Sequence, residues 1–492
     1  MTGRHRRRPP TADSDRPSRR RLGRGLRRVG LALLLTSALL ALARPALAHG
    51  GALRGASRDS LAVPTWLFLS TGGGVVGASF LLASFVTDRG FVRAVHDWGG
   101  LLPDPGRAVR LVARLLSVVV LAVTVAVGFV GPDTAYRNLA VLVVWVLWWG
   151  GYVASTYLVA NTWPTLNPWR TLAEPLPSLD RDYPDGWGAW PSVAALLLLI
   201  WVEVTAPVAD APSLLAAVIV GYTVATLAGT TVFGVDTWFE RVDPIARVFR
   251  YYGRVAPFRR TDDGVEFRLP GMALSETRLV TDRSEVAFVV ALLWVTTYDG
   301  FVGTPLWAGA DGNPGIAGVL VGAGVPAVLL YLLVFLVGYA GFLVAYFGAA
   351  ELARRFGDTY LTRDYLARRF APSLLAIAAG YQLAHNLATV LTLSPTVLSV
   401  AAAPLSPPQN PPLLAGLPAW FGGLELTAVL VGHLVAVWVA HATAFDVFPS
   451  RMQAVRSQYG VTLVMVLYTM TSLWIVSQPY AEPPFLGGLY GV

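Results

Sequence analysis

The chain has 492 residues, of which 54% are hydrophobic and only 14% are charged, whereas a water-soluble chain is about a quarter charged. It contains no cysteine and no lysine, which excludes disulfides, thiolate metal sites, cysteine nucleophiles and Schiff-base chemistry. The formal charge of +8 comes from residues 1–48, where 12 Arg and 2 Asp give +10 and leave −2 for the rest. Because the positive charge lies in this leader and in loops, we expect no nucleic-acid partner.

The N-terminal leader has the layout of a secretory signal peptide. Residues 1–28 are polar and rich in Arg, 29–42 are apolar, and Ala46-Leu47-Ala48 is a small-x-small cleavage pattern. An uncleaved first helix is the alternative. Cleavage after Ala48 would make His49 the mature N-terminus, whose amine and ring nitrogen together are a known copper-binding arrangement. Alternatively, His49 only suits the site preference of the signal peptidase and has no further role.

The rest of the chain, 49–492, is predicted to be one all-α domain, a polytopic bundle of transmembrane helices. The apolar residues fall in blocks of about 20, the length that crosses a ~30 Å hydrocarbon core. Ten such helices are predicted: 62–86, 111–131, 139–160, 191–209, 213–234, 285–304, 322–350, 372–394, 424–446 and 459–477.

The distribution of Arg orients this bundle in the plasma membrane. With the mature N-terminus outside, the predicted cytoplasmic loops hold 22 Arg and the outside segments hold 3, as the positive-inside rule requires. The C-terminus is then also outside. The cytoplasmic loops are 87–110, 161–190, 235–284, 351–371 and 447–458.

Three of the connecting segments have a distinct composition. Loop 161–190 is rich in Pro and Trp, which suits turns at the membrane interface. Loop 235–284 alternates basic and aromatic residues and then predicts a short hairpin at GVEFRLPG. We interpret this loop as a surface that faces lipid headgroups, in preference to a nucleotide or partner site. Segment 395–423 is rich in Pro and predicts a lid on the outside.

Ionisable side chains inside apolar helices are costly, which makes each a candidate functional residue. His385 and His433 each lie nine residues below the outer end of their predicted helices, roughly 13 Å deep. Asp299 and Glu203 lie five and six residues below the outer ends of theirs. Gln382, one turn from His385, is able to face the same way. These positions predict one outward-facing polar site.

His441 does not fit this set. It follows His433 by eight residues, which places it ~80° round the helix and ~12 Å deeper. There we expect it to pair with Asp446 or with loop Arg residues, while Glu425 lies at the outer mouth. Imidazole with carboxylate is a ligand set for zinc, copper or iron, and equally a proton relay. For any one of these residues a structural hydrogen-bonding role is the alternative.

Several strings taken together resemble the prokaryotic polytopic membrane proteins known as fenitrothion hydrolases. The resemblance spans nearly the whole mature chain. A His that the family carries near the start of the eighth helix is replaced by Pro372. The strings are His49-Gly50; Val63-Pro64-Thr65-Trp66-Leu67-Phe68; Trp163-Pro164-Thr165-Leu166-Asn167-Pro168-Trp169-Arg170; Thr296-Thr297-Tyr298-Asp299-Gly300-Phe301 with Pro305-Leu306-Trp307; Ala384-His385; Gly432-His433 with Ala440-His441; and Arg456-Ser457-Gln458-Tyr459.

The resemblance implies hydrolysis of an organophosphotriester, in which a metal-bound hydroxide attacks phosphorus. His385, His433 and His49 would hold the metal, zinc or copper, and Asp299 or Glu203 would be the general base. The second hypothesis is a transporter of a metal ion, copper first, or of a small solute coupled to protons, with His441 as the next step inward. The third is a membrane subunit without activity of its own. The bilayer and a small-molecule or metal-ion ligand are the expected partners.

Overall fold

The computed structural model describes residues 65–103, 106–262, 264–310, 312–414, 416–418 and 420–484. The predicted leader, its cleavage site and His49 lie outside these residues. Within them the chain is predominantly helical, with two small sheets.

Each of the ten predicted helices overlaps an apolar helix of the structure. Among the described residues, eight helices are long and apolar enough to cross a membrane, or nine if the bent pair of α3 (Thr65–Phe85) and α4 (Arg89–His96) forms one span. The shorter α10 has 16 residues. The membrane-helix class is thus confirmed, and the count of ten stays a prediction. The helices are α3 (Thr65–Phe85), α5 (Arg107–Val130), the run α6 (Leu139–Val141), η2 (Leu142–Tyr152) and α7 (Val153–Leu158), α10 (Trp190–Thr205), α11 (Pro212–Phe233), α14 (Arg283–Val302), α17 (Ala327–Phe356), α19 (Ser373–Ala402), α20 (Phe421–Val447) and α21 (Arg451–Ser477).

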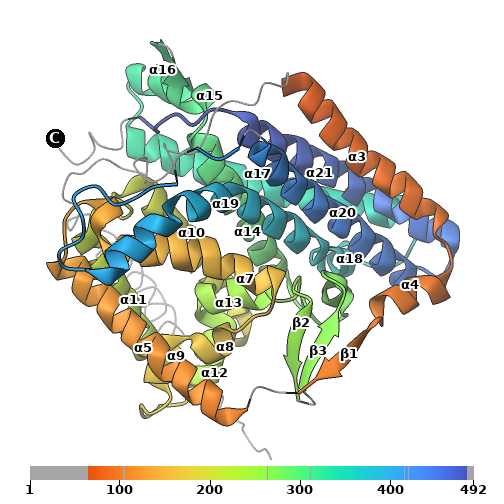
Figure 1. The fold of residues 1–492 in the computed structure, drawn as a ribbon. Coiled ribbons are helices and arrows are strands. Elements are labelled where there is room, and N and C mark those ends of the chain that lie inside the picture. Colours follow the sequence, from red (N-terminus) through yellow and green to blue (C-terminus); the bar gives the residue numbers. More distant parts are fainter. Residues whose placement is uncertain are drawn as a thin grey trace, which may run out of the picture.

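Helix α14 lies at the centre of the bundle. It packs against α10, α17, α19 and α21, and its buried residues go round the whole helix. Helix α3 packs on the outer side of α20 and α21 (Figure 1). Helices α5, η2, α10 and α11 form a second group beside this core. A helix that is apolar on every side is expected at such a central position.

The predicted cytoplasmic loops lie together on one face, which we call the arginine-rich face. Arg283 of one loop pairs with Asp364 of another. Arg89 donates to the carbonyls of Phe448 at 2.6 Å and Pro449 at 2.9 Å, and so tethers the end of α20. A guanidinium at the carbonyl end of a helix also complements the helix dipole.

The described parts of the predicted outside segments lie on the opposite, arginine-poor face. Arg137 donates to the carbonyls of Pro407 and Pro408 at 3.2 and 3.1 Å. Near the C-terminus, the Tyr331 hydroxyl donates to the carbonyl of Pro484 at 3.1 Å. The grouping of segments by face therefore agrees with the distribution of Arg, whereas the assignment of one face to the cytoplasm stays a prediction.

The predicted hairpin in loop 235–284 is present and larger than expected. Strands β2 (Phe258–Thr261) and β3 (Gly264–Arg268) pair antiparallel, and β1 (Gly99–Leu102) pairs with the other edge of β3. At Gly99 a Cβ would lie 1.9 Å from the carbonyl oxygen of Phe267, so the close approach of these strands requires glycine. Strand β1 was not foreseen, because its four exposed residues, two Gly followed by two Leu, carry no alternating pattern.

Helix α19 ends at Ala402 rather than at the predicted 394. Pro395 lies inside it and cannot donate to the carbonyl of Leu391. The Ser394 hydroxyl donates to that carbonyl at 2.8 Å instead, so the helix continues. The segment that follows folds back on α19, where the Thr396 hydroxyl donates to the carbonyl of Pro412 at 2.7 Å.

Short helices complete the two faces. Helix α4 is bent by 119° from α3, and Asp88 caps it by accepting from the amide of Phe91 at 2.8 Å. The other short elements are α4 (Arg89–His96), η1 (Ala135–Arg137), α8 (Trp163–Leu166), α9 (Pro168–Ala173), η3 (Asp185–Trp187), α12 (Val235–Thr237), η4 (Trp238–Val242), α13 (Pro244–Tyr252), η5 (Met272–Ser275), α15 (Pro305–Ala308), β4 (Gly309–Ala310), β5 (Asn313–Pro314), α16 (Ile316–Gly322) and α18 (Arg363–Phe370).

Asp243 gives the arginine-rich face a pH dependence. This buried residue caps α13 by accepting from the amide of Ala246 at 2.6 Å, and it also accepts from the Tyr222 hydroxyl. Burial raises its pKa to about 6, although these hydrogen bonds and the charge of Arg247 lower it. A folded pKa above the unfolded one means that stability from this group is present at low pH and is lost as pH rises toward 6.

We therefore expect Asp243→Asn, which keeps an acceptor for the cap, to become more favourable relative to wild type as pH rises from 4 to 6. The stability difference should change by about 1.4 kcal/mol for each pH unit in that window. Unfolding of detergent-solubilised protein across pH 4 to 7 measures this, with the exposed Asp133→Asn as the control. A difference that does not change with pH would contradict the expectation.

Candidate functional site

Asp299 and His385 are brought together by α14 and α19. The Nε2 atom of His385 lies 2.9 Å from Oδ2 of Asp299, and the two side chains are only 10% and 12% exposed. The ring of Tyr381, one turn before His385, stacks on the imidazole with centroids 5.9 Å apart. At Gly300 a Cβ would lie 2.3 Å from the Tyr381 hydroxyl, so glycine beside Asp299 makes room for this ring.

Gln382 faces a different part of the bundle from the one predicted. Its amide oxygen accepts from the Tyr157 hydroxyl, and its amide nitrogen donates to the carbonyl of Trp149 at 2.8 Å. It therefore joins α19 to the η2–α7 run. Successive turns of a helix share a face only approximately, and here Gln382 and His385 contact different neighbours.

The close crossing of α19 and α20 fixes the relative depth of their histidines. At Gly380 a Cβ would lie 2.6 Å from the carbonyl oxygen of Ala428 and 3.1 Å from the Cα of Gly432. Since the helices run antiparallel, His385, five residues after Gly380, lies about level with Glu425. The eight residues from there to His433 place its imidazole roughly 12 Å closer to the arginine-rich face.

The predicted common depth of the two histidines is therefore wrong. Depth was counted from predicted helix ends that were taken to be level, whereas the contact of Gly380 with Ala428 and Gly432 sets the register, so that α19 extends well beyond the start of α20 at Phe421. His433 is completely buried and its Nδ1 lies 2.8 Å from the carbonyl oxygen of Val429. This contact places the ring hydrogen on Nδ1 in the neutral form. Within the described part of the chain, its Nε2 has no hydrogen-bond partner.

His441 lies deeper still, at the break between α3 and α4. Its Nε2 lies 2.9 Å from the carbonyl oxygen of Val86, and its Nδ1 lies 3.3 Å from the amide oxygen of Gln458. The amide nitrogen of Gln458 is itself engaged with the carbonyl of Ala454 at 2.8 Å. Both ring nitrogens thus face acceptors, and only a protonated imidazole donates to both.

The expected pairing of His441 with Asp446 is not observed. Asp446 pairs with Arg369 at 2.6 Å instead. The residues that hold His441, Val86 and Gln458, were missed at the sequence level. The backbone carbonyl of Val86 becomes available only because α3 breaks there, which no side-chain pattern announces. Gln458, a polar residue in an apolar helix, was a detectable signal.

Glu203 lies in a separate place. It lines an apolar cavity of about 540 Å³ between α5, η2, α10 and α11, whose surface includes Trp145, Trp148 and Trp163. The cavity thus provides a carboxylate in apolar, aromatic surroundings. Among the predicted site residues that the structure describes, Asp299 and His385 are in contact with each other.

A transition-metal centre requires several His, Asp or Glu side chains close together. In the described ranges, no three His, Asp or Glu side chains lie close enough together to share a metal ion. A catalytic zinc usually takes three protein ligands. The described residues alone therefore do not fit such a centre, and His49, the remaining predicted ligand, lies outside them.

The fold and these side chains define a polytopic helical membrane protein with ionisable groups at successive depths along α20. Comparison with known protein families, with curated proteins and with solved structures finds no match. The resemblance to fenitrothion hydrolases accordingly stays a prediction from the sequence.

Proposed function

We propose that this protein carries protons across the membrane along α20, coupled to the transport of a small solute. The observation that supports this proposal is a series of ionisable groups at successive depths in the bundle. Glu425 and the Asp299–His385 pair lie at one level, His433 follows about 12 Å deeper, and His441 another 12 Å beyond. A single metal centre would need these groups at one depth, whereas a relay needs them in succession.

Each of these ionisable groups has a chemical role in the relay. Asp299 receives a proton at the arginine-poor face and shares it with the His385 Nε2 atom. His433 offers a buried Nε2 lone pair. When His441 takes up the proton, its imidazolium donates to both the Val86 carbonyl and the Gln458 amide oxygen. The intervals exceed a hydrogen bond of roughly 3 Å, so water or the solute bridges them.

The first test removes the acid at the entrance. In liposomes, a potassium gradient with valinomycin sets a membrane potential that drives protons inward. Proton influx is followed with a trapped pH-sensitive dye. We expect Asp299→Asn to slow influx at least tenfold, since the amide cannot titrate. Asp133→Asn, an exposed loop residue on the same face, is the matched control and should leave the rate unchanged. Wild-type influx no faster than in protein-free liposomes would count against the proposal.

His441→Gln tests the inner end of the same path. Glutamine retains hydrogen-bonding atoms but carries no titratable proton, so influx should fall as far as in Asp299→Asn. An undiminished rate would show that protons do not pass His441. The unfolding temperature of each variant separates loss of the relay from loss of the fold.

The same histidine distinguishes the alternative, a hydrolase of lipophilic phosphotriesters, which the resemblance implies. The observation in its favour is that Asp299 orients His385 in the manner of a general base. Hydrolysis of a nitrophenyl phosphotriester would then be lost in Asp299→Asn and retained in His441→Gln. Zinc, copper or iron at near-stoichiometric levels in protein purified without chelator would support the predicted metal centre.

A further inference from the structure

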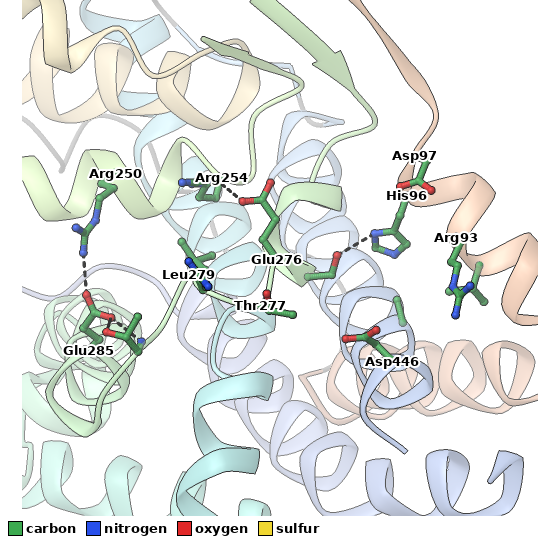
Figure 2. Close-up of a pocket in the computed structure, with 15 residues that line it drawn as sticks. Arg93, His96, Asp97, Arg250, Arg254, Glu276, Thr277, Leu279, Glu285 and Asp446 are labelled. Carbon is green, nitrogen blue, oxygen red and sulfur yellow. Dashed lines mark hydrogen bonds and ion pairs between the residues drawn. The ribbon is translucent and has the colours of Figure 1, made fainter. Parts of the chain in front are cut away.

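A polar cavity of about 690 Å³ opens on the arginine-rich face (Figure 2). It lies between α4, the segment that follows α13, and the end of α20. Its volume is within the range of small-molecule sites. None of the groups in the proposed relay lines it, so it requires a separate explanation. Among its lining residues are Arg93, Asp97, Arg254, Glu276, Arg278 and Asp446.

Guanidinium groups around this cavity outnumber the carboxylates that they contact. Glu285 pairs with both Arg247 and Arg250, at 3.0 and 3.1 Å. Figure 2 shows Glu285 and Arg250 at one side of the cavity, joined by this contact. Glu285 is thus shared between two guanidinium groups, of which Arg250 lines the cavity.

A second cluster of ion pairs lies at the strand side of the cavity. Arg254 donates to Glu276 at 2.7 Å, and Arg259 and Arg268 also pair with Glu276. Glu266 is the second carboxylate of this cluster, and it pairs with Arg259 and Arg268 at 2.9 and 2.6 Å. Three guanidinium groups share these two carboxylates, and of the five residues Arg254 and Glu276 line the cavity.

Arg93 and Arg278 are two further guanidinium groups of the cavity lining. Both line the cavity, are exposed, and form no ion pair with a described residue. Asp97 is the acid nearest to Arg93 along the chain and also has no ion-pair partner there. A guanidinium presents two parallel donors that match two phosphate oxygens. Unpaired guanidinium groups at a polar cavity therefore point to a phosphate-bearing ligand.

His96 provides a further donor or acceptor in a fixed place. Its Nδ1 lies 3.1 Å from the Ser275 hydroxyl and 3.3 Å from the carbonyl oxygen of Met272. Its ring stacks on Trp438 with centroids 6.4 Å apart. Its Nε2 is buried and has no hydrogen-bond partner among the described residues. A ligand in the cavity would therefore meet a ring that is already oriented.

The surroundings of α4 place this cavity at the level of lipid headgroups. Phe91 and Trp98 are 55% and 54% exposed, and the strand that follows exposes Leu101 and Leu102. Exposed aromatic and apolar side chains beside Arg are typical of a membrane interface. Basic pockets at the ends of membrane helices bind phosphate headgroups.

We propose that the cavity between α4, the segment after α13 and the end of α20 binds a phosphate group through Arg93 and Arg278. An anionic phospholipid headgroup and a free phosphate share this chemistry, and the exposed apolar edge of α4 favours the lipid. The proposal is independent of the proton relay.

Calorimetric titration of the purified full chain in detergent tests it. Dioctanoyl phosphatidylglycerol is one probe and inorganic phosphate at equal ionic strength is the other. We expect the Arg93→Gln/Arg278→Gln double variant to bind the lipid at least tenfold more weakly. The matched control is Arg451→Gln/Arg456→Gln, which removes from α21 two exposed Arg that lie outside the cavity and form no ion pair with a described residue. It should change affinity less than twofold.

Asp97→Asn is expected to have the opposite effect on affinity for the lipid. It removes a negative charge from the lining, so affinity for the lipid should increase, which a misfolded protein would not show. If inorganic phosphate alone binds with this dependence on Arg93 and Arg278, the ligand is a soluble phosphate compound. Absence of binding by both probes, or equal weakening in the two double variants, would overturn the site.

Discussion

Replacing Arg247 with Ala is expected to destabilise the protein by about 3–5 kcal/mol, the usual cost of removing one partner of a buried ion pair. The Arg247 side chain is 2% exposed and pairs with Glu285 at 3.0 Å. It also donates to the Ser192 hydroxyl at 3.1 Å and to the carbonyl of Glu240 at 2.6 Å. Its removal takes a donor from Glu285, from the Ser192 hydroxyl and from the Glu240 carbonyl at once, because this one guanidinium joins α10, η4, α13 and α14.

The unfolding temperature of detergent-solubilised protein measures this effect. Arg247→Lys should recover little of the loss, since an ammonium cannot reproduce the planar fork. Arg283→Ala is the matched control, because Arg283 also pairs with a carboxylate but is 66% exposed. Exposed pairs contribute little, so its unfolding temperature should hardly change. Equal losses in the two Ala variants would refute the role given to burial.

Gly432→Val is expected to destabilise the protein by about 3 kcal/mol or more, the upper end of the cost of overpacking. A Cβ at Gly432 would lie 2.6 Å from the carbonyl oxygen of Ala376 and 3.1 Å from the Cα of Gly380. Backbone atoms cannot rotate away as a side chain does, so α19 and α20 must separate. Proton influx should also fall in this variant, because the separation of the helices displaces His433, which lies beside this contact.

Gly423→Val is the control within the same helix. Nothing lies within 4 Å of a Cβ at Gly423, so the substitution tests helix propensity without crowding. The difference between the two variants isolates the helix crossing. Gly380→Val should resemble Gly432→Val, and the double variant should cost less than the two single losses together, since both disturb one contact. A Gly432→Val protein as stable as Gly423→Val would show that the crossing is not close.

The two stability variants also bear on the functional proposals. Arg247 lies beside Glu285, at the edge of the cavity proposed to bind phosphate, and Gly432 precedes His433 in the proposed relay. Binding and influx in these variants should therefore be compared only in protein shown to be folded at the temperature of the assay. The Arg93, Arg278 and His441 variants are the more direct tests of function.

Sequence alone predicted the helical membrane class, ten apolar segments that each overlap a helix of the structure, and the segments that share a face. These features depend on composition along the chain, since hydrocarbon requires apolar helices of a minimum length and Arg collects on one side. It also identified the ionisable residues within apolar segments, Asp299, His385, His433 and His441, because a charge in such surroundings is rare for an energetic reason.

Tertiary structure decided how these residues are combined. The contact of Asp299 with His385, the separation of His385 from His433 and the place of Glu203 in another cavity depend on helix rotation and register, which the glycine contact of α19 with α20 sets. The cavity of Arg93 and Arg278 joins residues about 185 positions apart. Hydrophobic periodicity specifies which segments enter the membrane, whereas side-chain packing between helices determines which polar groups meet there.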